Sequence, residues 1–335
     1  MRMAYGERFD IPTGYLNTAS IGVPPAFAAD AMAEVVDRWR RGDTNAPEFD
    51  APVAAARAAW ARIVGVEADR VAIASGVSQL VGQVAAGVPD GTRVLVAEGE
   101  FTSATFPFAA QGRGITVTEV PLAQIAERAS EFDLVAVSVV QSADGSIVDL
   151  AGLRAAGTRV LLDVTQAAGW LPLDLGWADW VVGGSYKWLL SPRGSAWLAI
   201  RSDAEELTKP VGANWYAGED PWDTVYSLPL RLASSARAFD LSPDWFAQVG
   251  AASALPWLAG LDMNEVHTHC VGLADKFLAG LGLPPAGSAI ISIDRSAESL
   301  TAAGIRCASR AGRARLAFHL YSTQEDVELA LAALR

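Results

Sequence analysis

An aspartate and a lysine are the two residues of this chain whose types and surroundings point most clearly to chemistry. Asp163 ends the apolar run Val160–Leu162, as expected at the carboxyl end of a buried strand. Lys187 lies in Gly183–Leu189, among glycine, hydroxyl-bearing and aromatic residues. Taken alone, Asp163 is most simply explained as a helix cap and Lys187 as a surface lysine. The apolar flanks of Lys187 argue against the second explanation.

A strand-end carboxylate and a lysine in an apolar segment are the two partners that a pyridoxal phosphate ring requires. The lysine amine holds the aldehyde of this cofactor as a Schiff base. The carboxylate keeps the pyridine nitrogen protonated, which lets the ring accept electrons. We therefore expect pyridoxal 5'-phosphate as the cofactor, with Lys187 and Asp163 as catalytic residues.

The segments around these two residues resemble the core of class V aminotransferases. They are Leu162–Gly169, Ala178–Trp180, Ser185–Leu189 and Ser191–Gly194. This group of fold-type I pyridoxal phosphate enzymes includes cysteine desulfurases, kynureninase, isopenicillin N epimerase-like proteins and C–S lyases. The resemblance implies an α/β fold with a mostly parallel central sheet flanked by helices, and a smaller α+β carboxy-terminal domain. It indicates the cofactor and the fold more specifically than the reaction.

A glycine turn near residue 76 lies where this family carries its phosphate-binding loop. A strand, Val71–Ala74, precedes the turn and a helix opens after it, so backbone N–H groups are available to an anion. Such a serine-rich turn is commonly only a helix cap. The downstream Lys187 favours phosphate binding, and the resemblance adds one hydroxyl from the lysine segment. The predicted ligands are Ser75, Gly76, Val77, Ser78 and Ser185.

Two further residues are assigned to the cofactor by resemblance. Phe101, in the segment Glu100–Phe108, falls where the family carries the ring that covers the pyridine face. Cysteine desulfurases have histidine at that position, so Phe101 favours another branch. Ordinary core packing is the alternative for a phenylalanine. Gln166 is expected to hydrogen-bond the phenolic oxygen of the cofactor.

Arg315 is the expected ligand of a substrate carboxylate, which a guanidinium binds through two parallel hydrogen bonds. In the family pattern this arginine directly precedes an apolar pair, here Leu316–Ala317. Arg313 remains open as the alternative, because residues two apart on a strand share a face. Asn17 is also expected at the substrate.

Two other segments are expected to contact the substrate. Gln141 and Ser142 follow a buried strand and face the expected crevice. The segment Lys209–Asp240 is rich in Trp, Tyr, Pro and Gly, and long aromatic loops in compact enzymes often line a site. Trp215 is the residue of this loop that we assign to the substrate.

The cysteines and histidines carry weaker expectations. A desulfurase needs a nucleophilic cysteine, and Cys307 lies in a strand-like segment close to Arg315, where a packing role is favoured. His267–Cys270 contains two histidines spaced two apart, which point in different directions on a helix, and no carboxylates complete a ligand shell. We therefore expect no metal site.

Length and composition agree with this class of enzyme. A chain of 335 residues, 51% of them hydrophobic, is long enough for two lobes. The net charge of −12 disfavours nucleic acid and anionic membranes as partners. Met1–Arg8 contains charged residues before any apolar run, which argues against a signal peptide. Polar residues interrupt the uncharged stretch Val71–Pro89, which argues against a membrane span. With only two cysteines, we expect a cytoplasmic protein.

Strand-like and helix-like segments alternate along the chain, as a parallel sheet with crossover helices requires. We expect residues 1–30 to form an amino-terminal segment that packs with the small domain, residues 31–235 the large cofactor-binding domain, and residues 236–335 the small α+β domain. The predicted strands are Val71–Ala74, Arg93–Ala97, Thr116–Glu119, Leu134–Val139, Arg159–Asp163, Trp180–Gly183 and Gly194–Ile200, with Ile290–Asp294 and Arg313–His319 in the small domain.

These observations predict an enzyme that acts on an α-amino acid or an amino-acid conjugate, as an aminotransferase or C–S lyase. An epimerase and a cysteine desulfurase are the alternatives within the family. A non-catalytic pyridoxal phosphate-fold protein is disfavoured because Lys187 and Asp163 are both present. A nucleotide-binding protein is disfavoured because the spaced glycines of that motif are absent. The resemblance also implies a homodimer.

Overall fold

The computed structural model describes residues 1–335 and shows a mixed α/β protein built around one seven-stranded sheet. The strand order is β3-β9-β8-β7-β6-β4-β5, and only β9 runs antiparallel to its neighbours. Every strand that the sequence predicts for this sheet is present. The strands are β3 (Val71–Ala74), β4 (Arg93–Ala97), β5 (Thr116–Val120), β6 (Leu134–Ser138), β7 (Arg159–Asp163), β8 (Trp180–Gly184) and β9 (Ala196–Ile200).

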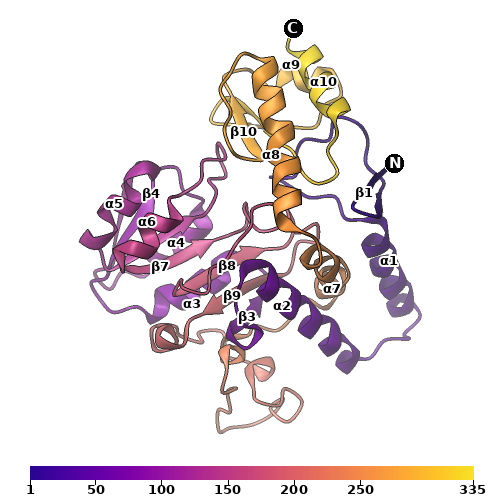
Figure 1. Cartoon of the computed structure of the whole chain (residues 1–335). Helices are drawn as coiled ribbons and strands as arrows, with labels where there is room; N and C mark the ends of the chain where they lie inside the picture. Colours follow the sequence, from indigo (N-terminus) through magenta and orange to yellow (C-terminus); the bar gives the residue numbers. More distant parts are fainter.

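Helices cover both faces of the sheet (Figure 1). Successive strand residues alternate between two apolar cores, so Ile73 packs with one layer and Ala72 and Ala74 with the other. The larger core includes side chains of α2 (Asp50–Val64), α5 (Ile125–Arg128), α6 (Leu150–Ala156) and α7 (Trp245–Ala259). The second core includes side chains of α3 (Val77–Gly87) and α4 (Thr102–Ala109).

A smaller unit forms around a three-stranded antiparallel sheet of order β10-β12-β11. The third apolar core of the molecule joins β10 and β12 to α8, α9 and α10. The strand β11 was not predicted as a separate element. The bounds are α8 (Met263–Gly280), β10 (Ile290–Ile293), α9 (Glu298–Ala302), β11 (Ala308–Arg310), β12 (Arg313–Ala317) and α10 (Gln324–Ala333).

The amino-terminal residues pack against the small unit. They form β1 (Arg2–Ala4) and β2 (Glu7–Phe9), while the helix α1 (Ala26–Arg40) that follows packs against α7. Arg2 makes a two-pronged ion pair with the buried carboxylate of Asp326 in α10. Asp326 also accepts a hydrogen bond from Gly14 N. These contacts hold the start of the chain beside its end (Figure 1).

The helix α7 packs against α1 and α2, on the large unit, although the predicted division begins the small domain at residue 236. Before it, a long connection leaves the body of the molecule and lies on the side opposite the small unit (Figure 1). Asp240 anchors the end of this connection through a buried ion pair with Arg57 and a hydrogen bond from Ile73 N.

Candidate active site

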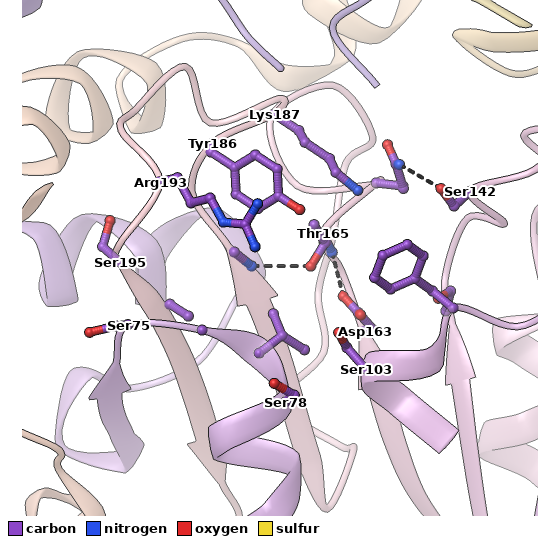
Figure 2. Close-up of a pocket in the computed structure, with 17 residues that line it drawn as sticks. Ser75, Ser78, Ser103, Ser142, Asp163, Thr165, Tyr186, Lys187, Arg193 and Ser195 are labelled. Atoms are coloured by element: carbon purple, nitrogen blue, oxygen red, sulfur yellow. Dashed lines mark hydrogen bonds between the residues drawn. The ribbon is translucent and has the colours of Figure 1, made fainter. Parts of the chain in front are cut away.

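A cavity of about 200 Å³ lies at the carboxyl ends of the central parallel strands. The register of the sheet places Ser138, Asp163 and Val182 side by side across β6, β7 and β8. The carboxyl edge of a parallel sheet is the usual ligand site of such folds. The residues that line the cavity are Ser75, Gly76, Val77, Ser78, Phe101, Ser103, Ser138, Ser142, Asp163, Thr165, Gln166, Gly184, Tyr186, Lys187, Arg193, Ser195 and Ala196 (Figure 2).

Lys187 reaches into this cavity from the loop after β8 and is only 6% exposed (Figure 2). Its Nζ lies 5.3 Å from the centroid of the Phe101 ring and 5.5 Å from that of Tyr186, and it forms no ion pair. Burial lowers the pKa of Lys187 to about 8, an effect that the charge of Asp163 opposes and that of Arg315 reinforces. The amine is therefore much easier to deprotonate than an exposed lysine.

Asp163 lies at the end of β7, in the same cavity, and is 4% exposed. Its Oδ1 accepts a hydrogen bond from Thr165 N at 2.8 Å, and no protein donor reaches Oδ2. No helix follows, so helix capping does not account for this aspartate. Burial raises the pKa of Asp163, while the Thr165 hydrogen bond and Lys187 oppose the shift. A cation placed at Oδ2 would favour the ionised form.

Close backbone packing fixes the loop that carries Lys187. Gly22 N donates a hydrogen bond to Tyr186 O at 2.9 Å. A Cβ at Gly22 would lie 1.9 Å from the Lys187 carbonyl oxygen, so only glycine allows this approach. On the other side of the loop, Trp188 O contacts Nε2 of the buried His319 at 3.0 Å.

The turn after β3 forms one end of the cavity. The helix α3 begins here without a side-chain cap, which leaves its first N–H groups available to a ligand. Ser75 and Ser78 line the cavity, as do Gly76 and Val77. Arg193 and Ser195 approach the same end from the loop after Lys187 (Figure 2). The Ser195 Oγ is buried and has no hydrogen-bond partner.

Ser185 is not among the residues that line the cavity. Its side chain is fully buried, and its hydroxyl donates to Pro192 O at 2.5 Å. The neighbouring Tyr186 faces the cavity instead, with the Arg193 guanidinium 5.2 Å from its ring centroid. The loop after β8 therefore turns Tyr186 and Arg193 toward the cavity, and not the predicted Ser185.

Phe101 is 44% exposed and lines the cavity, so it is not an ordinary core residue. The buried carboxylate of Glu100 fixes this position. Glu100 accepts hydrogen bonds from Phe101 N at 2.8 Å, from Ser138 N at 2.8 Å and from the Ser138 hydroxyl at 2.5 Å. Burial raises the pKa of Glu100 against these hydrogen bonds. The ring is therefore held on the side of the cavity formed by β4 and β6.

Gln166 lines the cavity with both ends of its amide already bonded to protein. Its Nε2 donates to Ala19 O at 3.0 Å and to Ser142 Oγ at 3.1 Å. Its Oε1 accepts from Trp188 Nε1 at 2.8 Å. A bond to the cofactor therefore requires an exchange with Ser142.

The two candidate arginines on β12 differ in burial and in their hydrogen bonds. Arg315 is 1% exposed and hydrogen-bonds Ser142 O, Ser142 Oγ and Ser20 Oγ. Burial and the charge of Arg310 lower the pKa of Arg315 to about 10. Arg313 is exposed and bonds only Ser292 O. The backbone of Asn17 forms an isolated β-bridge with Ala317 of β12, and the side-chain Oδ1 of Asn17 is buried without a hydrogen-bond partner.

None of the four residues assigned to the substrate, Arg315, Asn17, Gln141 and Trp215, lines the cavity itself. Gln141 is buried, and its Nε2 donates to Glu100 at 3.2 Å, while its neighbour Ser142 lines the cavity. Trp215, in the short helix η6 (Trp215–Ala217), packs against Trp222 with ring centroids 5.0 Å apart. Trp222 in turn donates to Asp50 at 2.7 Å.

The cysteines and histidines lie apart from the cavity lining. Cys307 packs against the apolar core of the small unit, and burial raises its pKa. Cys270 is fully buried. His267 stacks on Trp170, and no group of three or more His, Cys, Asp or Glu side chains is arranged to hold a metal ion. None of the helices combines the length and the apolar character needed to cross a membrane.

Several lining residues were not singled out from the sequence. Tyr186 and Arg193 stand within segments that resemble the family core, so their position was a usable signal. Thr165 and Ser103 also stand within segments compared with the family, Leu162–Gly169 and Glu100–Phe108, whereas Ser138 and Ser195 lie outside them and carry no sequence signal of their own.

Comparisons with known proteins identify the family and the fold of this chain. The family model "Aminotransferase class-V" matches residues 32–286. An uncharacterized aminotransferase of Bacillus subtilis, YcbU, is 27% identical over 331 residues, which cover 90% of this chain and 88% of that protein.

Two solved structures have a similar fold. An apo cysteine desulfurase from Thermococcus onnurineus gives a TM-score of 0.83 at 19% identity, covering 96% of this chain and 94% of the other. The cystine C–S lyase C-DES, solved with its product cysteine persulfide, gives 0.84 at 20% identity and covers 96% and 97%. These matches confirm the predicted fold-type I architecture. With three quarters of its length matched by the family model, the chain belongs to the class V aminotransferases, which are pyridoxal phosphate-dependent enzymes acting on amino acids.

Proposed function

We propose that this enzyme catalyses transamination or C–S bond cleavage of an α-amino acid or amino-acid conjugate, with pyridoxal phosphate attached to Lys187 as a Schiff base. One observation carries the proposal. Lys187 and Asp163 converge in one cavity, and the amine has a pKa of about 8 and no ion-pair partner. At pH 7 about one such amine in ten is neutral, against about three in ten thousand for an ordinary lysine.

The polar groups of the cavity fit this cofactor. Asp163 has an oxygen free of protein donors, as a partner of the pyridine nitrogen must. At the other end, the buried Ser195 hydroxyl lacks a partner and the uncapped start of α3 offers N–H groups. Arg193 supplies a positive charge there. We assign the phosphate to this end, to Ser75, Gly76, Val77, Ser78, Arg193 and Ser195, and the ring face to Phe101.

Bound pyridoxal phosphate supplies an electron sink for the bonds to the substrate α-carbon. Lys187 then provides the base, since its Nζ in the neutral form accepts the proton from that carbon. Arg315 holds the substrate carboxylate, and its buried guanidinium donates in a fixed fork. Asn17, at the neighbouring bridge to β12, is the second residue that we assign to the substrate. The rings of Phe101 and Tyr186 lie on either side of the reacting amine, with centroids 5.3 and 5.5 Å from Lys187 Nζ.

The place of Cys307 argues against the desulfurase alternative. A persulfide-forming cysteine must reach the substrate sulfur, whereas Cys307 is half-buried against the core of the small unit and does not line the cavity. Burial also raises the pKa of its thiol, which disfavours the nucleophilic thiolate. Transamination and C–S cleavage need no such cysteine.

We also propose a cytoplasmic homodimer. The long connection before α7 exposes several large apolar side chains, with Tyr226 at 82%, Leu228 at 86% and Leu230 at 66%. Exposed apolar patches commonly mark protein interfaces. In such a dimer, Trp215, the residue of this connection that we assigned to the substrate, would serve the cavity of the partner subunit. Sedimentation of the wild type and of a Leu228→Ser, Leu230→Ser variant tests this, and a monomeric wild type would exclude it.

The cofactor assignment has a direct test, because the chain contains only three lysines, Lys187, Lys209 and Lys276. Purified protein mixed with pyridoxal phosphate should absorb in the visible range. Borohydride treatment followed by peptide mass mapping should place the cofactor on Lys187. Lys187→Ala should fold but lose the band, while Lys209→Ala and Lys276→Ala, which change exposed lysines, should retain it. A label on either exposed lysine alone would refute the assignment.

A further inference from the structure

The hairpin Ala308–Ala317, formed by β11 and β12, carries three arginines on one face. In its register Arg310 stands directly opposite Arg313, and Ala308 stands opposite Arg315. Since strand side chains alternate, Arg310, Arg313 and Arg315 share a face. The intervening Ala314 is buried in the core of the small unit, so the arginine face is turned away from that core.

The charges of this arginine face are not balanced by the protein. Like charges directly opposite on neighbouring strands destabilise a sheet. None of the ion pairs in the structure includes Arg310, Arg313 or Arg315. This lack of partners is notable because the chain has 38 acidic and only 26 basic residues. A bound anion would relieve the repulsion.

The hairpin turn keeps the two outer arginines together. Ala311 and Gly312 join the strands, with φ values of 48° and 77°. Such a two-residue turn with both φ values positive matches the twist of a tight hairpin. A left-handed conformation is unfavourable for alanine, and such strain concentrates at functional sites. The pair Arg310 and Arg313 is thus presented at a fixed, narrow tip.

Neither Arg310 nor Arg313 lines the cavity, but both lie on the strand face that also carries Arg315, and Arg315 contacts the cavity wall. Arg315, on the same strand, hydrogen-bonds Ser142, which lines the cavity. Arg310 is near enough that its charge lowers the pKa of both Lys187 and Arg315. In the proposed function the cofactor phosphate balances Arg193 and the substrate α-carboxylate balances Arg315. Arg310 and Arg313 remain without a counter-charge.

We propose that Arg310 and Arg313 bind a second carboxylate on the substrate side chain, so that the enzyme takes an acidic amino acid or an acidic conjugate. This inference rests on the proposed function, because it requires an amino acid bound at Lys187 and Arg315. Arg315 selects the α-carboxylate, and the hairpin tip distinguishes an anionic side chain from a neutral one of the same shape.

Isosteric pairs of ligands test the inference on the cofactor-loaded enzyme. The pairs are L-aspartate with L-asparagine, L-glutamate with L-glutamine, and S-carboxymethylcysteine with S-carbamoylmethylcysteine. Dissociation constants come from the change in the visible spectrum on titration, without any need for turnover. We expect the acid of at least one pair to bind more than tenfold tighter than its amide, as hydrogen bonds to a charged group require. The preference should fall as salt is added.

Matched variants assign the preference to the hairpin. In the double variant Arg310→Gln, Arg313→Gln, the preferred acidic ligand should bind about tenfold more weakly, while the affinity for its amide is little changed. Arg154→Gln, on α6, removes an exposed arginine that also has no ion pair and should leave the preference intact. The thermal midpoint of the double variant should not fall, because a repulsive pair has been removed.

The possible outcomes are distinct. Equal affinity for acid and amide in all three pairs, with clear spectral changes, would overturn the inference and leave the proposed function standing. A preference that survives in the double variant would also overturn it. No spectral change with any amino acid would refute the proposed function and the inference together.

Discussion

The indole Nε1 of Trp188 donates a hydrogen bond to Gln166 Oε1 at 2.8 Å, which ties the residue after Lys187 to the turn after Asp163. Gln166 Nε2 continues the link to Ser142 Oγ, which also accepts from Arg315. The lysine loop, the carboxylate turn and Arg315 are therefore joined through a chain of side-chain hydrogen bonds. A change at one of them should be felt at the others.

Trp188→Phe tests this connection. The change leaves Gln166 Oε1 buried without a donor, which should cost about 1–3 kcal/mol of unfolding free energy beyond the lost packing. Trp197→Phe is the matched control, because Trp197 is equally buried but its Nε1 has no partner. Urea unfolding of both variants measures the difference. Equal losses would show that the Trp188 hydrogen bond contributes no stability.

The depressed pKa of Lys187 predicts how fast the cofactor attaches. Only the neutral amine attacks an aldehyde, so the attachment rate should rise about tenfold per pH unit and level off above a pKa of about 8. Stopped-flow absorbance of the cofactor-free protein mixed with pyridoxal phosphate measures this profile. A midpoint near the pKa of an exposed lysine would show that burial does not lower the pKa of Lys187.

Two substitutions should move this midpoint in opposite directions. Arg315→Gln removes a like charge that disfavours the protonated amine, so the midpoint should rise. Asp163→Asn removes the opposite charge that favours protonation, so the midpoint should fall. The same stopped-flow series reports both. Shifts of the same sign would show that conformation, not charge, controls the amine.

Arg315 should dominate substrate binding over Arg313. Losing a charge-assisted bidentate pair costs roughly 2 to 4 kcal/mol, so Arg315→Ala should lower kcat/KM by about 30- to 1000-fold for the best amino-acid substrate. Arg315→Lys should recover only part, because an ammonium lacks the planar fork. Amines without a carboxylate should be little affected. A large loss in Arg313→Ala with none in Arg315→Ala would exchange their roles.

Cys307→Ser should keep most of the turnover on the true substrate. The half-buried thiol packs against the core of the small unit, so serine should perturb packing and not chemistry. Steady-state kinetics check the turnover, and mass spectrometry of the protein during turnover checks for a persulfide. A persulfide on Cys307 would establish the desulfurase alternative.

Periodic patterns and local chemistry determined much of this protein. Apart from the edge strand β5, the strands of the central sheet follow from apolar runs, because a strand buried on both faces has no polar alternation to maintain. Asp163 and Lys187 stand out for the same local reason, a charged residue in an apolar segment. Their meeting in one cavity follows from the general rule that the carboxyl ends of parallel strands share an edge.

Only the tertiary structure decided which neighbours of these residues reach the cavity. Ser185 and Tyr186 are adjacent, but the direction of the loop after β8 buries the first and exposes the second to the cavity. Gln141 and Ser142 are also adjacent, but Gln141 is buried against Glu100 and only Ser142 lines the cavity.

Arg313 and Arg315 share a strand face, so alternation alone cannot separate them. The contacts of β12 with Ser20 and Ser142, which are distant in sequence, bury Arg315 and leave Arg313 at the hairpin tip. Periodicity fixes the direction of a side chain, whereas its depth depends on which distant segment packs over it.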